Sequence, residues 1–581
     1  MSEGTPESPP TPIDPSEKVA PFRAVRWAEE TGLEVRLDDE WCRLIEVGSL
    51  DASSLLEHAR ATYGGRWLKR LGEDLPQVFF DMGLQLTTPV RVAVTRGTDQ
   101  TEQIWRECTA ENRKAALMFG REGASPAPRP AGSDVDVLAQ LLHSTHSYHS
   151  LAPDTDWVLE PARECVAQGG DSEVLEVAIV KSLARLGDGH TRVRRSLTRI
   201  LRESSRRLRN RPSFLPFSAV PLDDGRWVAS SESGRLLAES HPFLIGLDGA
   251  PLAEWLRVGG AVVVHGAPQL RRLKISHVLR EFHWLRPQVA PANATDNEVA
   301  ITLSDGRSEL TLTLDVGGVA LADPTPGGQS TQLPDGVGYL PVAAMGEPDD
   351  AVAALEKLRD CRGLVVDLRG NAGGHRQLVR ALVPHLLDAG SPSVVYNLAK
   401  KRLLGGERAD EPQLLADRGL FPRTAPDQHD AAALTAIDLL ASSFLPEWEP
   451  PEAEFSEWCF GVLSPGSADW HYRGPIAVLT DERCFSAGEI FATALLQAPN
   501  SIHIGRPTGG GSGRAVGHVL PSTGIAVQIS SMASFQPSGR LYEKRGVAPR
   551  HQVPLTADDF LGTGDRALVR ALELVDGAAS V

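Results

Sequence analysis

The sequence predicts a multidomain α/β protein, and three observations lead to this fold class. The chain has 581 residues, which is too long for one hydrophobic core. From about residue 336, short apolar runs alternate with helix-like segments, as in a parallel sheet covered by helices. Before that point, one pattern of strand, helix and strand pair occurs twice. We expect five parts: a disordered tail over 1–20, an α+β domain over 21–124, a helical domain over 134–212, a second α+β module over 213–325 and an α/β core over 336–581.

The composition excludes several classes of protein. Hydrophobic residues make up 41% and charged residues 23% of the chain, as in ordinary globular proteins. The 75 acidic and 59 basic side chains give a net charge of −16, which disfavours nucleic acid and anionic membranes as partners. The six cysteines form no CxxC pair, which favours reduced thiols. No signal peptide and no apolar run of membrane-spanning length is evident, so we expect a soluble, cytoplasmic protein.

The two α+β segments resemble each other. The string CRLIEVGSLDASSLLEHAR begins at Cys42, and the similar string PFLIGLDGAPLAEWLR begins at Pro242. Each is followed by an Arg-Leu pair in a helical stretch and then by two strand-like runs. This pattern predicts one small α+β topology built twice, over 42–108 and 242–314. A linker rich in Pro, Gly and Ser begins at Ser125 and separates the first copy from the helical domain.

The helical domain contains the clearest amphipathic pattern. Its apolar residues fall on one face of a helix over 171–186, namely Leu175, Ile179, Leu183 and Leu186. Gly187 ends this helix, and the string LGDGHT then holds His190 in a tight turn. Because most lone histidines are structural, His190 becomes a candidate base only in combination with other residues.

Two strand-to-helix junctions in the α/β core carry groups suited to catalysis. In GPIAVLTDERCFSAGEIFATALL, a buried strand leads to Ser486 directly before a helix, where unpaired N–H groups converge. A serine there is usually a helix cap, but the same turn exposes a hydroxyl as a nucleophile elbow does. In GLVVDLRGNAGG, the glycines allow a ligand to approach the backbone. This loop lacks the P-loop and dinucleotide patterns, so an oxyanion site is favoured over a phosphate site.

The last candidate residue, Glu543, lies in the string SFQPSGRLYEKRGVAPR, between a strand and a turn. A solvated glutamate is the ordinary alternative for such a position.

Taken together, these strings resemble a known family. GYLPV, LVVDLRGNAGG, FSAGEIFATAL, GRPTGGG and GRLYEKRGVAPR, in this order, are similar to the C-terminal processing (tail-specific) serine peptidases. With LGDGHT upstream, they look most like the tricorn-type branch, and the resemblance covers about residues 134–575. It implies a ClpP/crotonase-like core, a PDZ-like module over 213–325 with a related N-terminal domain, a peptide or protein substrate and no cofactor. It leaves open whether the chain forms a homo-oligomer.

The family uses either a serine-lysine dyad or a serine-histidine-glutamate site. Where the dyad lysine would stand, this chain reads TGGGSG from Thr508, and no lysine occurs between Ser486 and Glu543. The resemblance therefore implies Ser486 as nucleophile, His190 as base and Glu543 as the acid that orients the base. It also implies the backbone N–H groups of Gly373 and Ala487 as oxyanion donors.

One departure from the family pattern concerns the position before the histidine. The tricorn-type site carries a serine there, whereas this chain has Gly189, so the assisting hydroxyl is missing. A histidine base with an unperturbed pKa would make kcat/KM fall as the pH drops through about 6 to 7.

Three alternatives to the peptidase interpretation remain. Gly189 and the repeated modules would also suit a catalytically weak peptide-binding or scaffold protein on the same fold. Acyl-CoA chemistry on the related crotonase fold lacks any adenine- or phosphate-binding signal. His143, His146 and His149 stand three apart, but no carboxylate or cysteine lies at zinc-site spacing, so polar surface is favoured and no metal is expected.

Overall fold

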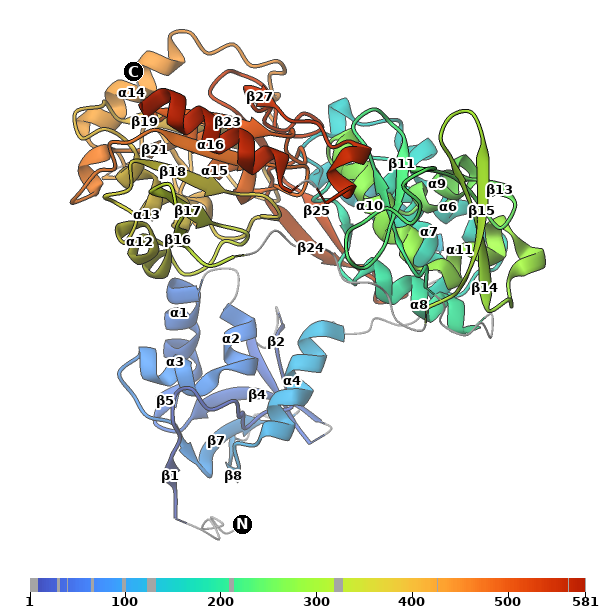
Figure 1. Cartoon of the computed structure of the whole chain (residues 1–581). Coiled ribbons are helices and arrows are strands. Elements are labelled where there is room, and N and C mark those ends of the chain that lie inside the picture. Colours follow the sequence, from blue (N-terminus) through green and yellow to red (C-terminus); the bar gives the residue numbers. More distant parts are fainter. Residues whose placement is uncertain are drawn as a thin grey trace. The chain divides into compact units, whose positions relative to one another are not determined.

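The computed structural model describes residues 9–28, 32–38, 40–63, 67–96, 101–122, 132–207, 214–317, 328–425, 427–562 and 564–579. The chain forms two compact units, Met1–Arg129 and Pro130–Val581 (Figure 1). The division falls within the segment rich in Pro, Gly and Ser. No described helix is long and apolar enough to cross a membrane. All six cysteines are buried free thiols.

The first unit is an antiparallel sheet packed against helices. The sheet has the strand order β2-β3-β4-β7-β8, with β5 paired to β4. The elements are β1 (Thr11–Pro12), β2 (Ala24–Ala28), β3 (Gly32–Leu37), β4 (Glu40–Val47), β5 (Leu50–Asp51), α1 (Ala52–Tyr63), α2 (Trp67–Glu73), α3 (Leu75–Asp81), β6 (Thr87–Thr88), β7 (Val90–Thr95), β8 (Thr101–Arg106) and α4 (Ala110–Glu122).

The predicted disordered tail is wrong for residues 9–20. Strand β1 pairs with β6, and Ile13 is buried, with its N–H donating to the carbonyl oxygen of Leu86. Because Ile13 joins the hydrophobic core, its burial offsets the entropy of ordering a segment whose composition favours disorder. Residues 1–8 lie outside the described residues.

The second unit begins with helices and a second antiparallel sheet. The sheet order is β10-β11-β12-β14-β15, with β13 paired to β12. The elements are α5 (Gly132–Thr145), α6 (Thr155–Ala167), α7 (Ser172–Ala184), β9 (Arg192–Val193), α8 (Leu197–Arg207), β10 (Ser218–Pro221), β11 (Trp227–Ser230), β12 (Phe243–Leu247), β13 (Ala250–Pro251), α9 (Leu252–Gly260), α10 (Pro268–Arg280), α11 (Phe282–Val289), β14 (Glu298–Ser304) and β15 (Glu309–Asp315).

The two antiparallel sheets have the same construction. In each, a strand turns into a short hairpin partner, a helix follows, and the next long strand pairs antiparallel with the first. Both pairings also shift register at the same point, between Leu44 and Glu46 in β4 and between Leu244 and Gly246 in β12. The segments that begin at Cys42 and Pro242 therefore fold with one topology.

The segments expected as a helical domain and an α+β module share one hydrophobic core. This core contains Leu175 and Ile179 of α7, Trp255 of α9 and Val299 of β14. Asp171 caps the N-terminus of α7 by accepting hydrogen bonds from the next turn. The buried face of α7 is thus fixed against the second sheet, which holds the loop after α7 in place.

The α/β core is a mainly parallel sheet of order β16-β17-β18-β22-β23-β27. Helix α16 covers one face, and α13 and α15 cover the other. A second sheet has the order β20-β21-β19-β26, and a third, β24-β25-β9, joins the core to the loop after α7. The elements are β16 (Thr331–Gln332), β17 (Val337–Pro341), α12 (Pro348–Glu356), β18 (Gly363–Asp367), α13 (Gln377–Leu382), β19 (Val394–Lys401), β20 (Phe421–Pro422), α14 (Ala431–Ala441), β21 (Cys459–Leu463), β22 (Ile476–Thr480), α15 (Ala487–Leu495), β23 (Ser501–Gly505), β24 (Ala515–Val519), β25 (Ala526–Ser530), β26 (Met532–Phe535), β27 (His551–Gln552) and α16 (Arg566–Ala579).

Candidate active site

Ser486 lies at the turn between β22 and α15 in a conformation that few non-glycine residues adopt. Its φ is 56° and its ψ is −119°. It occupies the N-cap position of α15, yet its side chain makes no capping hydrogen bond. Its backbone N–H donates to the carbonyl oxygen of Gly511 at 2.9 Å, which holds the turn. Backbone strain of about 1–3 kcal/mol is thus kept at this residue, and the hydroxyl is not used as a helix cap.

His190 is the hydrogen-bond partner of that hydroxyl. It lies in the loop between α7 and β9, and its Nε2 is 3.2 Å from the Oγ of Ser486. The ring of Phe485 stacks on the imidazole, with 5.0 Å between ring centroids and 19° between planes. Burial lowers the pKa of His190 to about 4, and the nearby Asp188 carboxylate opposes this shift. The imidazole is therefore neutral at neutral pH, as a base must be.

Asp188 organises the loop that carries His190. The carboxylate accepts hydrogen bonds from the backbone N–H of His190 at 2.8 Å, from Thr191 Oγ1 at 2.6 Å and from His146 Nε2 at 2.9 Å. Although burial raises its pKa, the hydrogen bond and charge of His146 lower the pKa of Asp188 to about 2. Asp188 is thus a fixed negative charge beside His190, and no motif in the sequence marks it as a site residue.

Glu543 is buried close to His190 but makes no hydrogen bond with its ring. Its Oε1 accepts a long hydrogen bond of 3.5 Å from the backbone N–H of Gly189. Its Oε2 and the Nδ1 of His190 are buried and have no hydrogen-bond partner among the described residues. Donor atoms of Asp188, His190 and Glu543 all lie within 4.8 Å of one another. Burial raises the pKa of Glu543 well above its usual range, and the charge of Asp188 raises it further.

The two expected oxyanion donors meet at the N-terminus of α15. A Cβ on Gly373 would lie 2.7 Å from the backbone nitrogen of Ala487, so only glycine fits this contact. The N–H of Ala487, at the first position of α15, makes no hydrogen bond with the described residues. The N–H of Gly373 instead donates to Oδ1 of Asn371 at 2.9 Å. The N–H of Ala487 is therefore available to an oxyanion. The N–H of Gly373 would have to exchange its hydrogen bond with Asn371 for one with the oxyanion.

The glycine-rich segment from Thr508 forms one wall of the site. Glu489 of α15 accepts hydrogen bonds from the N–H groups of Gly510 and Gly511 and from the hydroxyl of Thr508. A Cβ on Gly511 would lie 2.5 Å from the ring of Phe485, and one on Gly513 would lie 3.1 Å from His190. The backbone here packs directly on Phe485 and His190, so a larger side chain would displace them.

The three clustered histidines do not converge on one point. Helix α5 ends at Thr145, so His146 and His149 lie beyond it. Nδ1 of His143 is 2.9 Å from Nε2 of His149, whereas His146 is only 2% exposed and turns toward Asp188. The expectation of polar surface is wrong for His146, because Asp188 supplies a buried partner that lies far away in the sequence. Within the described residues, the single group with metal-ligating geometry is Asp188, His190 and Glu543.

Comparison with known proteins identifies the class of this enzyme. Residues 336–553 match the family model described as Peptidase family S41. This segment belongs to that family, which supports a serine-type peptidase of the C-terminal processing group. No curated protein sequence shows significant similarity to the chain.

Several solved structures match this chain over most of its length. Mature CPAF complexed with lactacystin has 15% sequence identity and a TM-score of 0.48, with 78% of this chain and 97% of that chain covered. The photosystem II D1 C-terminal processing protease has 16% identity and a TM-score of 0.37, with 73% and 93% covered. The tricorn protease has 14% identity and a TM-score of 0.34, with 84% and 40% covered. At these values, the likenesses carry no argument about this chain.

Proposed function

We propose that this peptidase cleaves peptide bonds through an acyl-enzyme on Ser486, with His190 as general base and Glu543 as the orienting acid. The observation that carries the proposal is the 3.2 Å distance between His190 Nε2 and Ser486 Oγ, at a serine that is strained and does not act as a cap. A serine hydroxyl is a weak nucleophile until a base accepts its proton, and this pair meets that requirement.

The proposed reaction follows from the atoms at the site. Ser486 Oγ attacks the carbonyl carbon of the scissile bond while His190 Nε2 takes the hydroxyl proton. The oxyanion accepts a hydrogen bond from the N–H of Ala487, and from Gly373 once its bond to Asn371 opens. His190 then gives the proton to the leaving amine, and water hydrolyses the acyl-enzyme by the same steps.

Glu543 and Asp188 have separate tasks in this proposal. Hydrogen bonds at catalytic sites often tighten only when substrate binds, and a small shift would join Glu543 Oε2 to Nδ1 of His190. Asp188 fixes the backbone of the loop and supplies a permanent negative charge. The parallel sheet with helices on both faces supports a ClpP/crotonase-like core, and the sheet around β12 and β14 supports a PDZ-like module with a related copy in the first unit.

A second candidate is a catalytically weak peptide-binding protein on the same fold. It is favoured by the unpartnered Nδ1 of His190 and by the engaged N–H of Gly373.

Labelling with a fluorophosphonate probe separates the two candidates. We expect the probe to label the wild type, and Ser486→Ala to lose both labelling and peptidase activity. Its free energy of unfolding should change by no more than about 1 kcal/mol, because no capping bond is lost. The exposed Ser442→Ala is the matched control. Glu543→Gln should lower kcat/KM by about 10²- to 10⁴-fold. Full activity in Ser486→Ala would overturn the assignment, and an unlabelled, inactive wild type would favour the binding protein.

A further inference from the structure

A buried pair of side chains adjoins the loop that carries His190. Nε2 of His146 is 2.9 Å from Oδ2 of Asp188, and both side chains are only 2% exposed. Asp188 is ionised, and an ionised carboxylate only accepts hydrogen bonds. Nε2 of His146 therefore carries a proton and donates it to this bond, so the imidazole serves as a buried donor rather than as a solvated group.

The carboxylate of Asp188 shapes the catalytic loop from within. Its Oδ1 accepts a hydrogen bond from the backbone N–H of His190 at 2.8 Å, and its Oδ2 accepts one from Thr191 Oγ1 at 2.6 Å. Both of these bonds stay inside the loop. Among the described residues, His146 is the side chain that ties the carboxylate to another segment. The position of His190 thus depends on where His146 holds Asp188.

The segment that carries His146 is itself anchored to β25. The backbone N–H of Ser147 donates to the carbonyl oxygen of Ser530 at 2.8 Å, and the hydroxyls of these two serines are 3.0 Å apart. The N–H of Ser530 in turn donates to Thr191 Oγ1 at 3.0 Å. Hydrogen bonds therefore join the segment after α5, the catalytic loop and β25 in a closed ring.

Packing alone does not fix the buried pair. A cavity of about 250 Å³ borders it, with His146, Asp188 and Glu543 in the lining. Nδ1 of His146 is buried and has no hydrogen-bond partner in the described part of the chain. A buried nitrogen without a partner destabilises a fold, and an apolar side chain would avoid this loss. The bond from Nε2 to Asp188 is therefore what the imidazole contributes.

We propose that His146 is a positioning residue of the reaction: its hydrogen bond to Asp188 holds the loop so that His190 Nε2 meets Ser486 Oγ. The proposal rests on the peptidase function above and adds a residue that acts through Asp188. The contact between His190 and Ser486 is 3.2 Å long, so a small displacement of the loop breaks it. A displacement of about 1 Å at a reacting group lowers a rate by about 10²-fold.

Substitutions at position 146 test the proposal. His146→Leu removes the donor, and we expect kcat to fall about 10²-fold while KM stays within about threefold. His146→Gln keeps an amide N–H at a similar reach, so its kcat should stay within about tenfold of the wild type. Turnover is counted per Ser486 that a fluorophosphonate labels to completion, so misfolded enzyme does not contribute. If His146→Leu does not fold, the more adaptable His146→Met, which also lacks a donor, replaces it.

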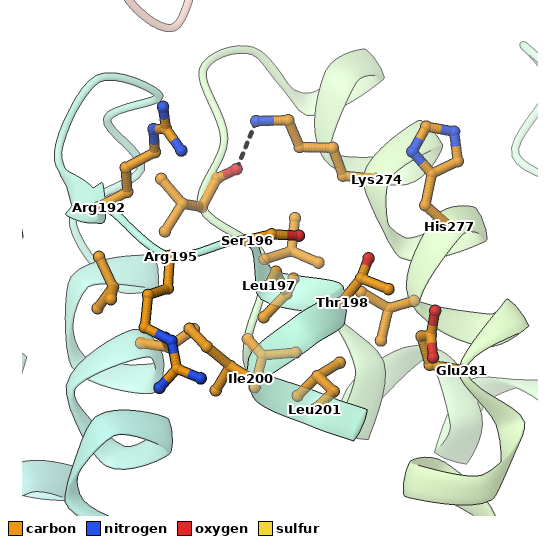
Figure 2. A pocket seen from close by; sticks show the side chains of 16 residues that line it. Arg192, Arg195, Ser196, Leu197, Thr198, Ile200, Leu201, Lys274, His277 and Glu281 are labelled. Carbon is orange, nitrogen blue, oxygen red and sulfur yellow. Dashed lines mark hydrogen bonds between the residues drawn. The ribbon is translucent and has the colours of Figure 1, made fainter. Parts of the chain in front are cut away.

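A histidine of another cavity provides the matched control. His277 lines a cavity of about 380 Å³ between α8 and α10 (Figure 2), and no described residue lines both cavities. His277→Leu and His277→Gln should leave kcat and KM unchanged. The proposal is overturned if His146→Leu keeps the wild-type kcat per labelled site, or if His146→Gln loses as much activity as His146→Leu.

A double-mutant cycle shows whether His146 acts through Asp188. Asp188→Ala removes the acceptor and should lower kcat by itself. Adding His146→Leu should then lower kcat by no more than about threefold, because the bond is already lost. Losses that multiply in the double variant would show that His146 acts independently of Asp188, contrary to the proposal.

NMR of isotope-labelled histidines keeps this result separate from the chemistry. In the Ser486→Ala background, His146→Leu should shift the ring resonances of His190, and His277→Leu should not. If no peptide is cleaved by the wild type but these shifts are present, the proposed reaction fails and the placement of His190 by His146 stands. Unchanged His190 resonances in His146→Leu would contradict the positioning role, whether or not the wild type is active.

Discussion

At the residue scale, the candidate site combines a neutral imidazole, a fixed anion and a buried carboxyl group whose pKa is raised. His190 is partly buried and has a pKa lowered to about 4, Asp188 has a pKa lowered to about 2, and the pKa of Glu543 is raised. One environment produces all three shifts, because burial disfavours charge and only Asp188 receives enough hydrogen bonds to remain ionised. The strained turn at Ser486 leaves its hydroxyl without a capping hydrogen bond.

The pH dependence of kcat/KM tests this electrostatic arrangement. His190 must be unprotonated to act as base, so kcat/KM should fall as the pH drops through about 4, below the range of an unperturbed histidine. The Asp188 charge favours the imidazolium, so Asp188→Asn should move the midpoint to lower pH. It should also lower the plateau, because the imidazolium formed during acylation loses its stabilising charge. Asp156→Asn, on the exposed start of α6, is the control. A midpoint that stays in place or rises in Asp188→Asn would contradict this account.

Metal addition and removal provide a second test at this scale. The mechanism needs no metal, so chelators should leave kcat/KM unchanged. Asp188, His190 and Glu543 nevertheless have the donor types that zinc prefers. Added Zn²⁺ should therefore inhibit the enzyme by binding to His190. The fraction of activity lost should be smaller in Glu543→Gln than in the wild type, each measured relative to the same enzyme without zinc. Loss of activity with EDTA and recovery with zinc would instead indicate a metalloenzyme.

At the element scale, the loop after α7 and the glycine-rich segment from Thr508 pack on the turn before α15. Phe485 occupies the space beside His190 that a side chain at position 189 would need. A Cβ on Gly189 would lie 2.5 Å from the Cζ atom of Phe485. The absence of the family's serine at this position therefore has a packing cause, because the aromatic ring and that side chain exclude each other.

Gly189→Ser tests this packing argument. We expect kcat/KM to fall and the unfolding free energy to drop by about 1–3 kcal/mol, because Phe485 must leave its place on His190. Adding Phe485→Ala should recover part of the stability, with a coupling of about 0.5–3 kcal/mol in a double-mutant cycle. Gly390→Ser, where a Cβ has open space, is the control. Additive losses in the cycle would show that the two positions do not compete.

At the scale of the whole molecule, every proposed site residue belongs to the second unit, although the sequence separates His190 from Ser486 by 296 positions. Strand β9, directly after His190, pairs with β25 of the core and joins the helices to the catalytic sheet. The active site is thus assembled within one compact unit.

A shortened chain of residues 130–581 should therefore retain peptidase activity. We expect its kcat/KM to stay within about twofold of the full chain, since a compact unit with its own core can fold alone. The same chain with Ser486→Ala is the control for contaminating activity. A folded but inactive shortened chain would show that the first unit contributes to catalysis.

The sequence by itself determined the local features of this protein. Hydrophobic periodicity and glycines predicted α7, the strands and helices of the core, and the two copies of one α+β topology, because these depend on neighbouring residues. The motifs also singled out Ser486, His190 and Glu543 as candidates. Only the tertiary structure brought Asp188 and His146 together and gave Phe485 its place on His190. It also decided that Glu543 is buried rather than solvated. These properties depend on contacts between segments that are 42 to 354 residues apart, and burial among such segments sets the charges at the site.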